Sequence, residues 1–126
     1  MSNHDKFWHI TFHPYRRQEA LLDDEVAQYF YKLVRDVENR LGFSIVRMSA
    51  MPEYVHLLLE LPPWLDLIEV IRQLKGYTAR ELLKRYPDMR SPGFWAAGYH
   101  YVQHSAASLN TVVQYIEEQK TKSGLE

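Results

Sequence analysis

The sequence predicts an α+β fold of the ferredoxin-like type, in which a four-stranded antiparallel sheet carries helices on one face. The first observation is the order of hydrophobic patterns along the chain, which reads βαββαβα. The second is the short turn at residues 51–53, which joins the second and third strands as a hairpin, while each helix can act as a crossover. The third is the length of 126 residues, which suits one domain spanning residues 1–126.

The first three elements are defined by composition and by the residues at their ends. Residues 6–13 are rich in aromatic and β-branched side chains and stop at Pro14, which predicts the first strand. Acidic residues at positions 23–25 suit the start of a helix, and Gly42 suits its end. The apolar face of this helix consists of Val26, Phe30, Leu33, Val34, Val37 and Leu41. Residues 43–50 follow as the second strand.

The second half of the chain continues the alternation of strands and helices. Residues 54–61 alternate in character and end at two consecutive prolines, which predicts the third strand. A second helix is expected over residues 65–86, an aromatic fourth strand over residues 94–104 and a last helix over residues 108–120. In the third strand, the face toward the helices should carry Val55, Leu57, Leu59 and Leu61, and the opposite face Tyr54, His56, Leu58 and Glu60.

The last predicted helix carries a tyrosine and a glutamine one turn apart, beside an apolar stripe. Tyr115 and Gln119 have the i, i+4 spacing of neighbours on a helix surface. The stripe contains Leu109, Val112, Val113 and Ile116. Aromatic residues beside such a stripe usually complete a core or an interface, but the open face of the sheet needs a cover, from this helix or from that of a second subunit. The fold would then bring a phenol and an amide to His56, which suggests a metal-assisted tyrosine nucleophile.

Composition excludes several classes of function. The chain has no cysteine, which excludes disulfide frameworks, thiolate chemistry and cysteine-type zinc sites. No segment reaches the ~20 apolar residues of a membrane span. The polar start lacks the apolar run of a secretory signal, so we expect a cytoplasmic protein with no membrane partner.

The net charge of −1 argues against nonspecific coating of nucleic acid, but one segment is basic. Residues 72–90 contain six lysines and arginines and only two acids. This segment could contact phosphates, or it could be a solvated helix whose long cationic side chains cover apolar surface. Composition alone favours the second interpretation.

Five short motifs follow one another along nearly the whole chain. They are WHITF followed by YRR at residues 8–17, MPEYVHLLL at 51–59, LKGYTAR at 74–80, FWAAGY at 94–99 and YIEEQ at 115–119. Together they resemble the small HUH tyrosine transposases of minimal bacterial insertion sequences, which cut and rejoin single-stranded DNA. Each motif alone is weak, but their shared order and spacing make the resemblance specific.

The resemblance implies a function and the residues that carry it. The chain would be a metal-dependent endonuclease and strand transferase, a transposase that forms a covalent phosphotyrosine with single-stranded DNA at hairpin ends of a mobile element. Tyr115 would be the nucleophile, and His56 and Gln119 would be ligands of Mg²⁺ or Mn²⁺. The family works as a homodimer whose final helices complete the partner's site. DNA contacts would come from Arg16, Arg17, Lys75 and Arg80.

Tyr54 departs from the family pattern, since the family has the first histidine of its His-hydrophobic-His strand at this position. A phenol with an ordinary pKa of ~10 is a poor metal ligand unless the cation removes its proton. Tyr54 could still bind the metal, a water could replace it, or metal binding and catalysis could be lost. His100 and His104 are alternative ligands, whereas His9 is predicted to be a hydrogen-bonded residue of the sheet.

Three hypotheses about function follow from these observations. The first is the strand transferase itself, and the second is a catalytically impaired homologue that binds single-stranded DNA hairpins without cleaving them. The third is a ferredoxin-like module that binds a protein or small ligand and has no salt-sensitive affinity for DNA.

Overall fold

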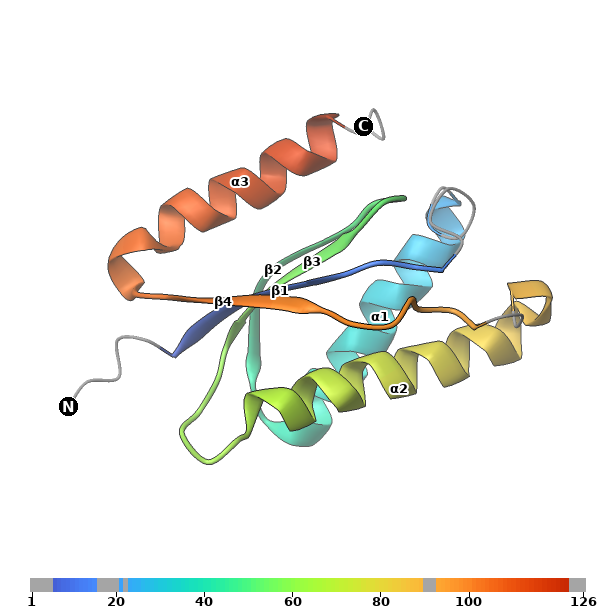
Figure 1. The fold of residues 1–126 in the computed structure, drawn as a ribbon, viewed down its shortest axis with the longest axis horizontal. Coiled ribbons are helices and arrows are strands. Elements are labelled where there is room, and N and C mark those ends of the chain that lie inside the picture. The colour runs from blue at the N-terminus through green and yellow to red at the C-terminus, as the bar shows by residue number, and fades with distance from the viewer. Residues whose placement is uncertain (1–5, 16–20, 22, 90–92, 123–126) are drawn as a thin grey trace.

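The computed structural model of the chain describes residues 6–15, 21, 23–89 and 93–122. Its strands are β1 (Phe7–Phe12), β2 (Ser44–Ala50), β3 (Val55–Glu60) and β4 (His100–His104), and its α-helices are α1 (Asp24–Leu41), α2 (Leu67–Arg85) and α3 (Leu109–Lys122). The strands form one antiparallel sheet in the order β2-β3-β1-β4 (Figure 1). This element order and topology confirm the predicted fold class.

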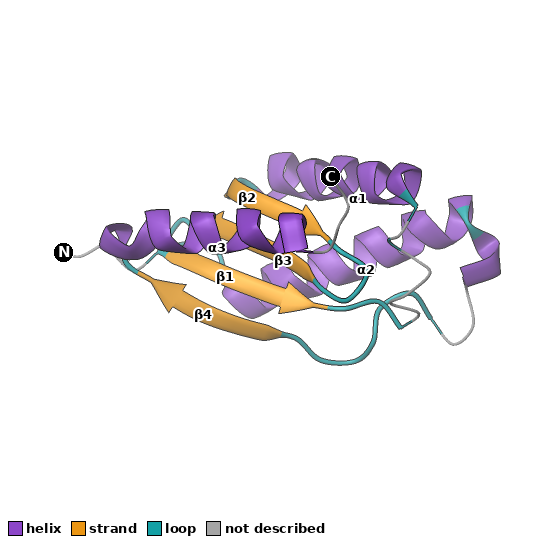
Figure 2. Ribbon diagram, turned by 90° about the horizontal axis from the view of Figure 1, so that it is seen from above, coloured by secondary structure: helices purple, strands orange, loops and turns teal. Residues whose placement is uncertain are grey.

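The helices cover both faces of the sheet. Figure 1 shows α1 and α2 on one side and α3 on the other, and Figure 2 shows α3 lying over the sheet. The main core lies between the sheet and the first two helices, and it includes Val55, Leu57 and Leu59 of β3. A separate small cluster of Leu58, Val112 and Ile116 lies under α3. The predicted division of β3 into two faces, with α3 over the second face, is therefore confirmed.

Capping residues set the limits of the first two helices. The side chain of Asp23 accepts a hydrogen bond from the backbone of Glu25 at the start of α1, and Asp66 caps α2 through Glu69 in the same way. Gly42 ends α1 with φ of +91°, the left-handed conformation that glycine adopts without strain. These signals explain why the predicted helix limits are close to the observed ones.

The fourth strand is shorter than predicted, because β4 begins at His100 and not at residue 94. The preceding aromatic residues make only an isolated antiparallel bridge, between Trp95 and Pro14, and they also pack on the core. The indole nitrogen of Trp95 donates a hydrogen bond of 2.9 Å to the hydroxyl of buried Thr78. Gly98 then adopts φ of +91°, which interrupts the extended backbone. The prediction of one strand over residues 94–104 was therefore wrong in its extent, and only residues 100–104 form β4.

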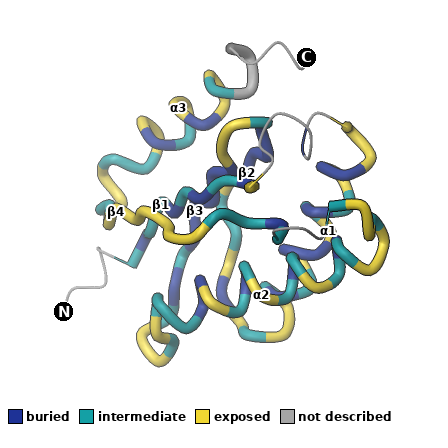
Figure 3. The backbone as a smooth tube through the Cα atoms, turned by 45° about the vertical axis from the view of Figure 1, so that its right-hand side comes forward, coloured by how far each residue is buried: buried dark blue, intermediate teal, exposed yellow. Residues whose placement is uncertain are grey.

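The sheet is unevenly exposed. The central strands β1 and β3 are largely buried, whereas every residue of β4 except His104 is exposed (Figure 3). Within the part of the chain that the structure describes, no helix is long and apolar enough to cross a membrane.

Candidate active site

The centre of the candidate site is His56, on the α3 face of the central strand β3. Its neighbours Val55 and Leu57 point into the main core, and this alternation turns His56 to the opposite side. The side chain is only 6% exposed. A buried imidazole needs polar partners, and the adjacent strand provides one.

That partner is His9 of β1. The two rings stack at a centroid distance of 5.3 Å with 27° between their planes, and Nε2 of His9 lies 3.2 Å from Nδ1 of His56. In the strand register Thr11 lies directly opposite His56, so His9 is its diagonal neighbour on the same face. The predicted role of His9 as a hydrogen-bonded residue of the sheet is confirmed.

Tyr115 of α3 completes the group from above. Its ring lies 5.9 Å from the ring of His56 and 6.1 Å from that of His9, edge-on to both. Buried Val112 and Ile116, on the same helix, pack on Leu58 and hold α3 over this point of the sheet. Tyr115 itself is 46% exposed, so a phenol next to the buried imidazole of His56 and the half-buried imidazole of His9 remains open to an incoming molecule.

Both imidazoles are neutral at pH 7. Burial, followed by the neighbouring His56 and His104, lowers the pKa of His9 to about 4. Burial also lowers the pKa of His56. A neutral His56 keeps a lone pair that can bind a metal ion, and His9, with a pKa of about 4, is a weak general base at pH 7. The lowered pKa values therefore suit His56 as a metal ligand and argue against His9 as a general base.

These lowered pKa values predict that acid destabilises the protein. A histidine with a lowered folded pKa gains a proton on unfolding between that pKa, about 4 for His9, and its ordinary value of 6.5. The free energy of unfolding should be unaffected by this group above pH 6.5 and should fall by on the order of 1–3 kcal/mol as the pH decreases to 4. Urea titrations at several pH values would measure the slope. His9→Gln should flatten it and His100→Gln, at an exposed position of β4, should not; an unchanged slope in His9→Gln would contradict the prediction.

The other two predicted ligands, Gln119 and Tyr54, are more exposed than His56. Gln119 is half-buried and follows Tyr115 by one helical turn, so both side chains leave the same side of α3. Tyr54 is 40% exposed, and its ring lies 6.3 Å from that of His56 and 5.6 Å from that of His13. Among the described residues no three His, Cys, Asp or Glu side chains form a metal-binding group. The donors present, one neutral imidazole and one amide, suit a divalent cation that takes its remaining oxygens from water and phosphate.

The predicted DNA-contacting cations have different surroundings. Lys75 of α2 donates hydrogen bonds of 3.0 Å to the carbonyl oxygen of Ala96 and of 2.8 Å to that of Gly98, and burial lowers its pKa. Arg80 is largely exposed and pairs with Glu81 at 3.4 Å. Arg16 and Arg17 lie outside the described residues. The structure thus gives Lys75 an internal role and leaves Arg80 at the surface.

The contacts of Lys75 predict a large effect on stability. Lys75→Met should lower the free energy of unfolding by about 1–3 kcal/mol, because it removes two charge-assisted hydrogen bonds to the segment that leads into β4. Arg72→Met is the control, since its exposed ion pair with Glu69 should contribute less than about 1 kcal/mol. Urea unfolding would compare the two. If Lys75→Met unfolds like the unchanged protein but binds DNA less well, the ammonium acts on phosphate instead.

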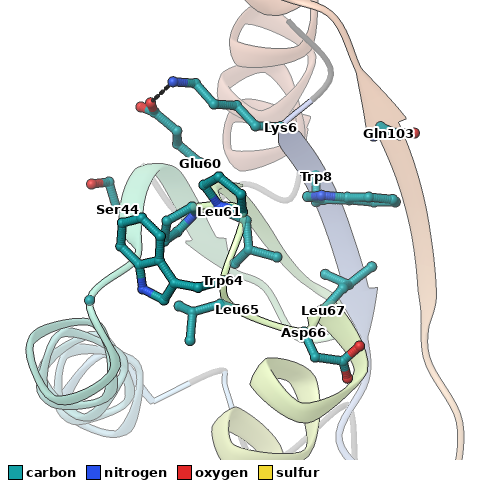
Figure 4. A pocket seen from close by; sticks show the side chains of 13 residues that line it. Lys6, Trp8, Ser44, Glu60, Leu61, Trp64, Leu65, Asp66, Leu67 and Gln103 are labelled. Carbon is teal, nitrogen blue, oxygen red and sulfur yellow. Dashed lines mark ion pairs between the residues drawn. The ribbon is translucent and has the colours of Figure 1, made fainter. Parts of the chain in front are cut away.

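A cavity of about 720 Å³ lies at the end of the sheet where β3 leads into the loop before α2 (Figure 4). The ion pair between Lys6 and Glu60, at 2.8 Å, stands beside it, and the exposed ring of Trp64 forms part of its wall. Neither His56 nor Tyr115 is among the described residues that line it. The candidate active site is therefore the group of His9, His56 and Tyr115 between the sheet and α3, and it is separate from this cavity.

Comparison with known proteins identifies the group of enzymes to which this arrangement belongs. The sequence profile of the IS200-like transposases matches residues 3–119. The chain belongs to this family. The resemblance drawn from the five motifs is thereby confirmed.

Individual relatives of this transposase span most of its length. The ISDra2 transposase TnpA of Deinococcus radiodurans is 30% identical over 112 residues, which cover 86% of this chain and 79% of that protein. The transposase of the insertion sequence IS200 of Salmonella typhimurium is 25% identical over 116 residues, 89% of this chain and 75% of that protein.

Two solved structures have the same fold as this transposase. A transposase candidate from Deinococcus radiodurans R1 is 29% identical, with a TM-score of 0.73 and 91% of each chain covered. A REP-associated tyrosine transposase bound to a REP hairpin is 18% identical, with a TM-score of 0.73 over 98% of this chain and 71% of that chain. At this lower identity the similarity concerns the fold.

Sequence reasoning missed the place of His9 in the candidate site of this transposase and named His104 only as an alternative ligand. The ring of His104 lies 6.3 Å from that of His9, and His9 contacts both His56 and Tyr115. The available signal was the single histidine at an outward position of each of β1 and β3 together with the predicted sheet order. The relative register of the two strands, which decides whether the imidazoles meet, has no local signal in the sequence.

Proposed function

We propose that the chain cuts and rejoins single-stranded DNA through a covalent bond between Tyr115 and a DNA phosphate. The observation that carries the proposal is the exposed phenol of Tyr115, with its ring 5.9 Å from that of the buried imidazole of His56, in a chain of the IS200-like transposase family. Attack by the phenol of Tyr115 gives a phosphodiester, whereas attack by an imidazole nitrogen would give a phosphoramidate.

In the proposed reaction, the phenolic oxygen of Tyr115 forms a bond to phosphorus, and the bond from phosphorus to a sugar oxygen breaks. The phenol loses its proton, and the released sugar oxygen gains one. The phosphotyrosine retains a phosphodiester bond, so another sugar hydroxyl can attack it and reseal the strand without ATP. Phosphoryl transfer of this kind depends mainly on positioning and on neutralisation of charge.

We further propose that Mg²⁺ or Mn²⁺ takes part, held by His56 and Gln119, with Tyr54 at the edge of the group. When bound, such a cation would stabilise the negative charge on the phosphate oxygens. The chain's own residues would do the rest: the packing of α3 on Leu58 orients Tyr115, and the sheet holds His56 rigidly. On the DNA, Arg16, Arg17 and Arg80 are the proposed phosphate contacts, and Lys75 could join them only through the part of its ammonium not used by Ala96 and Gly98.

We propose a DNA hairpin as substrate and a homodimer as the working form. The family resemblance supports both, and one solved protein with this fold is bound to a REP hairpin. The distance between Tyr115 and His56 of the same chain supports cleavage within one protomer, even in a pair.

A labelled hairpin with a single-stranded flank, incubated with the protein and Mn²⁺, tests the proposal. The expected product is a protein-DNA adduct that survives denaturing electrophoresis. A mobility shift without an adduct would overturn catalysis and support the second candidate function, hairpin binding without cleavage. The position of Tyr54, where the family has a histidine, is the observation that favours this second function. An absence of salt-sensitive affinity would contradict both.

A further inference from the structure

The hydrogen bond between His9 and His56 restricts the tautomers of both rings. It joins two specified ring atoms, Nε2 of His9 and Nδ1 of His56, at 3.2 Å. Two lone pairs at this distance repel each other, and so do two N–H groups, so a single hydrogen lies between the rings. Either His9 or His56 donates it.

The two arrangements have opposite consequences for His56. If His9 donates, then Nδ1 of His56 accepts and its proton sits on Nε2, so the ring has no free lone pair for a cation. If His56 donates from Nδ1, its Nε2 lone pair is free, and His9 carries its own proton on Nδ1. Only the second arrangement allows His56 to act as a metal ligand through Nε2.

We propose that His9 is a positioning residue that accepts the hydrogen bond from His56 and thereby keeps the Nε2 lone pair of His56 available to a divalent cation. The inference rests on the proposed function of His56. Metal-binding histidines generally donate their second ring nitrogen to an acceptor that fixes the tautomer and the orientation of the ring. An imidazole in this role differs from the more usual carboxylate, because it adds no negative charge beside a site that must receive phosphate.

The surroundings of His9 suit this role. Its strand is paired with β3 on one side and β4 on the other, so its backbone cannot shift without breaking the centre of the sheet. The two rings also contact each other directly, with 5.3 Å between their centroids and 27° between their planes, so His9 restricts the orientation of the His56 ring. The edge of Tyr115 contacts both rings, so a rotation of His56 would also change the surroundings of the proposed nucleophile.

The direct test is the tautomer of each ring in the metal-free protein. Long-range proton-nitrogen correlation spectra of the ¹⁵N-labelled full chain at pH 7.5 should show a proton on Nδ1 of both His9 and His56. In His9→Phe the acceptor is lost, and His56 should change to the Nε2–H tautomer that imidazole side chains prefer in water. His9→Gln supplies an amide oxygen as acceptor and should retain the Nδ1–H form. Tyr101→Phe is the control, because Tyr101 lies on the other face of the sheet, where its ring contacts Trp8.

The functional consequence is measured with Mn²⁺ alone, by the signal of the free ion in electron paramagnetic resonance. His9→Phe should weaken Mn²⁺ binding about 10- to 100-fold, the usual effect of losing such a partner. His9→Gln should bind within a few-fold of the unchanged protein. A measurement of Mn²⁺ binding does not require DNA cleavage.

A proton on Nε2 of His56 in the unchanged protein would overturn the inference without the need for any variant. Equal Mn²⁺ affinity of His9→Phe and the unchanged protein would also overturn it. If the tautomers and affinities follow the expectation but no DNA adduct forms, the role of His9 stands and the proposed strand transfer fails.

Discussion

Tyr115→Phe is expected to abolish the covalent protein-DNA adduct completely while leaving hairpin binding within about twofold. The variant removes one oxygen, the proposed attacking atom, and keeps the ring that lies edge-on to His9 and His56. The packing of α3 through Val112 and Ile116 is untouched, so the fold should be preserved. Denaturing electrophoresis of a labelled hairpin, in parallel with a mobility-shift titration, measures both quantities.

Tyr101→Phe is the matched control for this experiment. Tyr101 is 45% exposed and Tyr115 46%, so the two phenols are about equally accessible to DNA. Tyr101 lies on β4, where its ring contacts Trp8 on the other face of the sheet. Adduct formation should be normal in Tyr101→Phe. An adduct that persists in Tyr115→Phe would remove Tyr115 as the nucleophile.

Tyr54→His is expected to strengthen Mn²⁺ binding by about tenfold or more. The loss of a hydrogen-bond partner of a metal ligand changes metal affinity by at least that factor, and a new imidazole ligand should contribute no less. Residues 54 and 56 lie on the same side of the extended chain, so the variant would offer two imidazoles in place of one imidazole and a phenol. The substituted ring is 40% exposed and can be replaced without opening the core. Free Mn²⁺ measured by electron paramagnetic resonance gives the affinity, and the yield of adduct gives the catalytic consequence.

The result also separates the two proposed functions. A sharp rise in adduct yield in Tyr54→His, from a low level in the unchanged protein, would mean that the phenol of Tyr54 is what prevents cleavage at an otherwise complete site. A high yield in the unchanged protein, with no gain in Tyr54→His, would contradict the idea that the phenol weakens the site. Tyr54→Phe is the control, because it removes the hydroxyl without adding a ligand and should not increase affinity.

Much of the fold was predictable because its signals are local. The alternation in β3 assigns Leu57 to the main core and Leu58 to the cluster under α3, as observed. Acids at the start of α1 and Gly42 at its end define that helix before any tertiary contact is known. The stripe on α3 likewise predicted the side that packs on the sheet, where Val112 and Ile116 are buried and Leu109 and Val113 partly buried.

The parts that could not be predicted depend on contacts between distant segments. The register of β1 against β3 brings His9 to His56, which is 47 positions away in the chain. Lys75 is a residue type that often contacts phosphate, but here its ammonium group donates hydrogen bonds to the carbonyl oxygens of Ala96 and Gly98 before β4. The aromatic residues before His100 have side chains typical of a strand, yet the positive φ of Gly98 interrupts the pairing, which resumes only as an isolated bridge between Trp95 and Pro14.

The attachment of α3 has a consequence for the energetics of the molecule. Among the described residues, the buried apolar side chains between this helix and the sheet are Leu58, Val112 and Ile116, whereas the opposite layer buries some twenty apolar side chains. With about 1.5–3 kcal/mol for each enclosed aliphatic side chain, undocking α3 is far less costly than unfolding the domain. Tyr115, the proposed attacking group, therefore lies on a helix that can undock at low cost, whereas His9 and His56 lie on the central strands of the sheet, which open only when the domain unfolds.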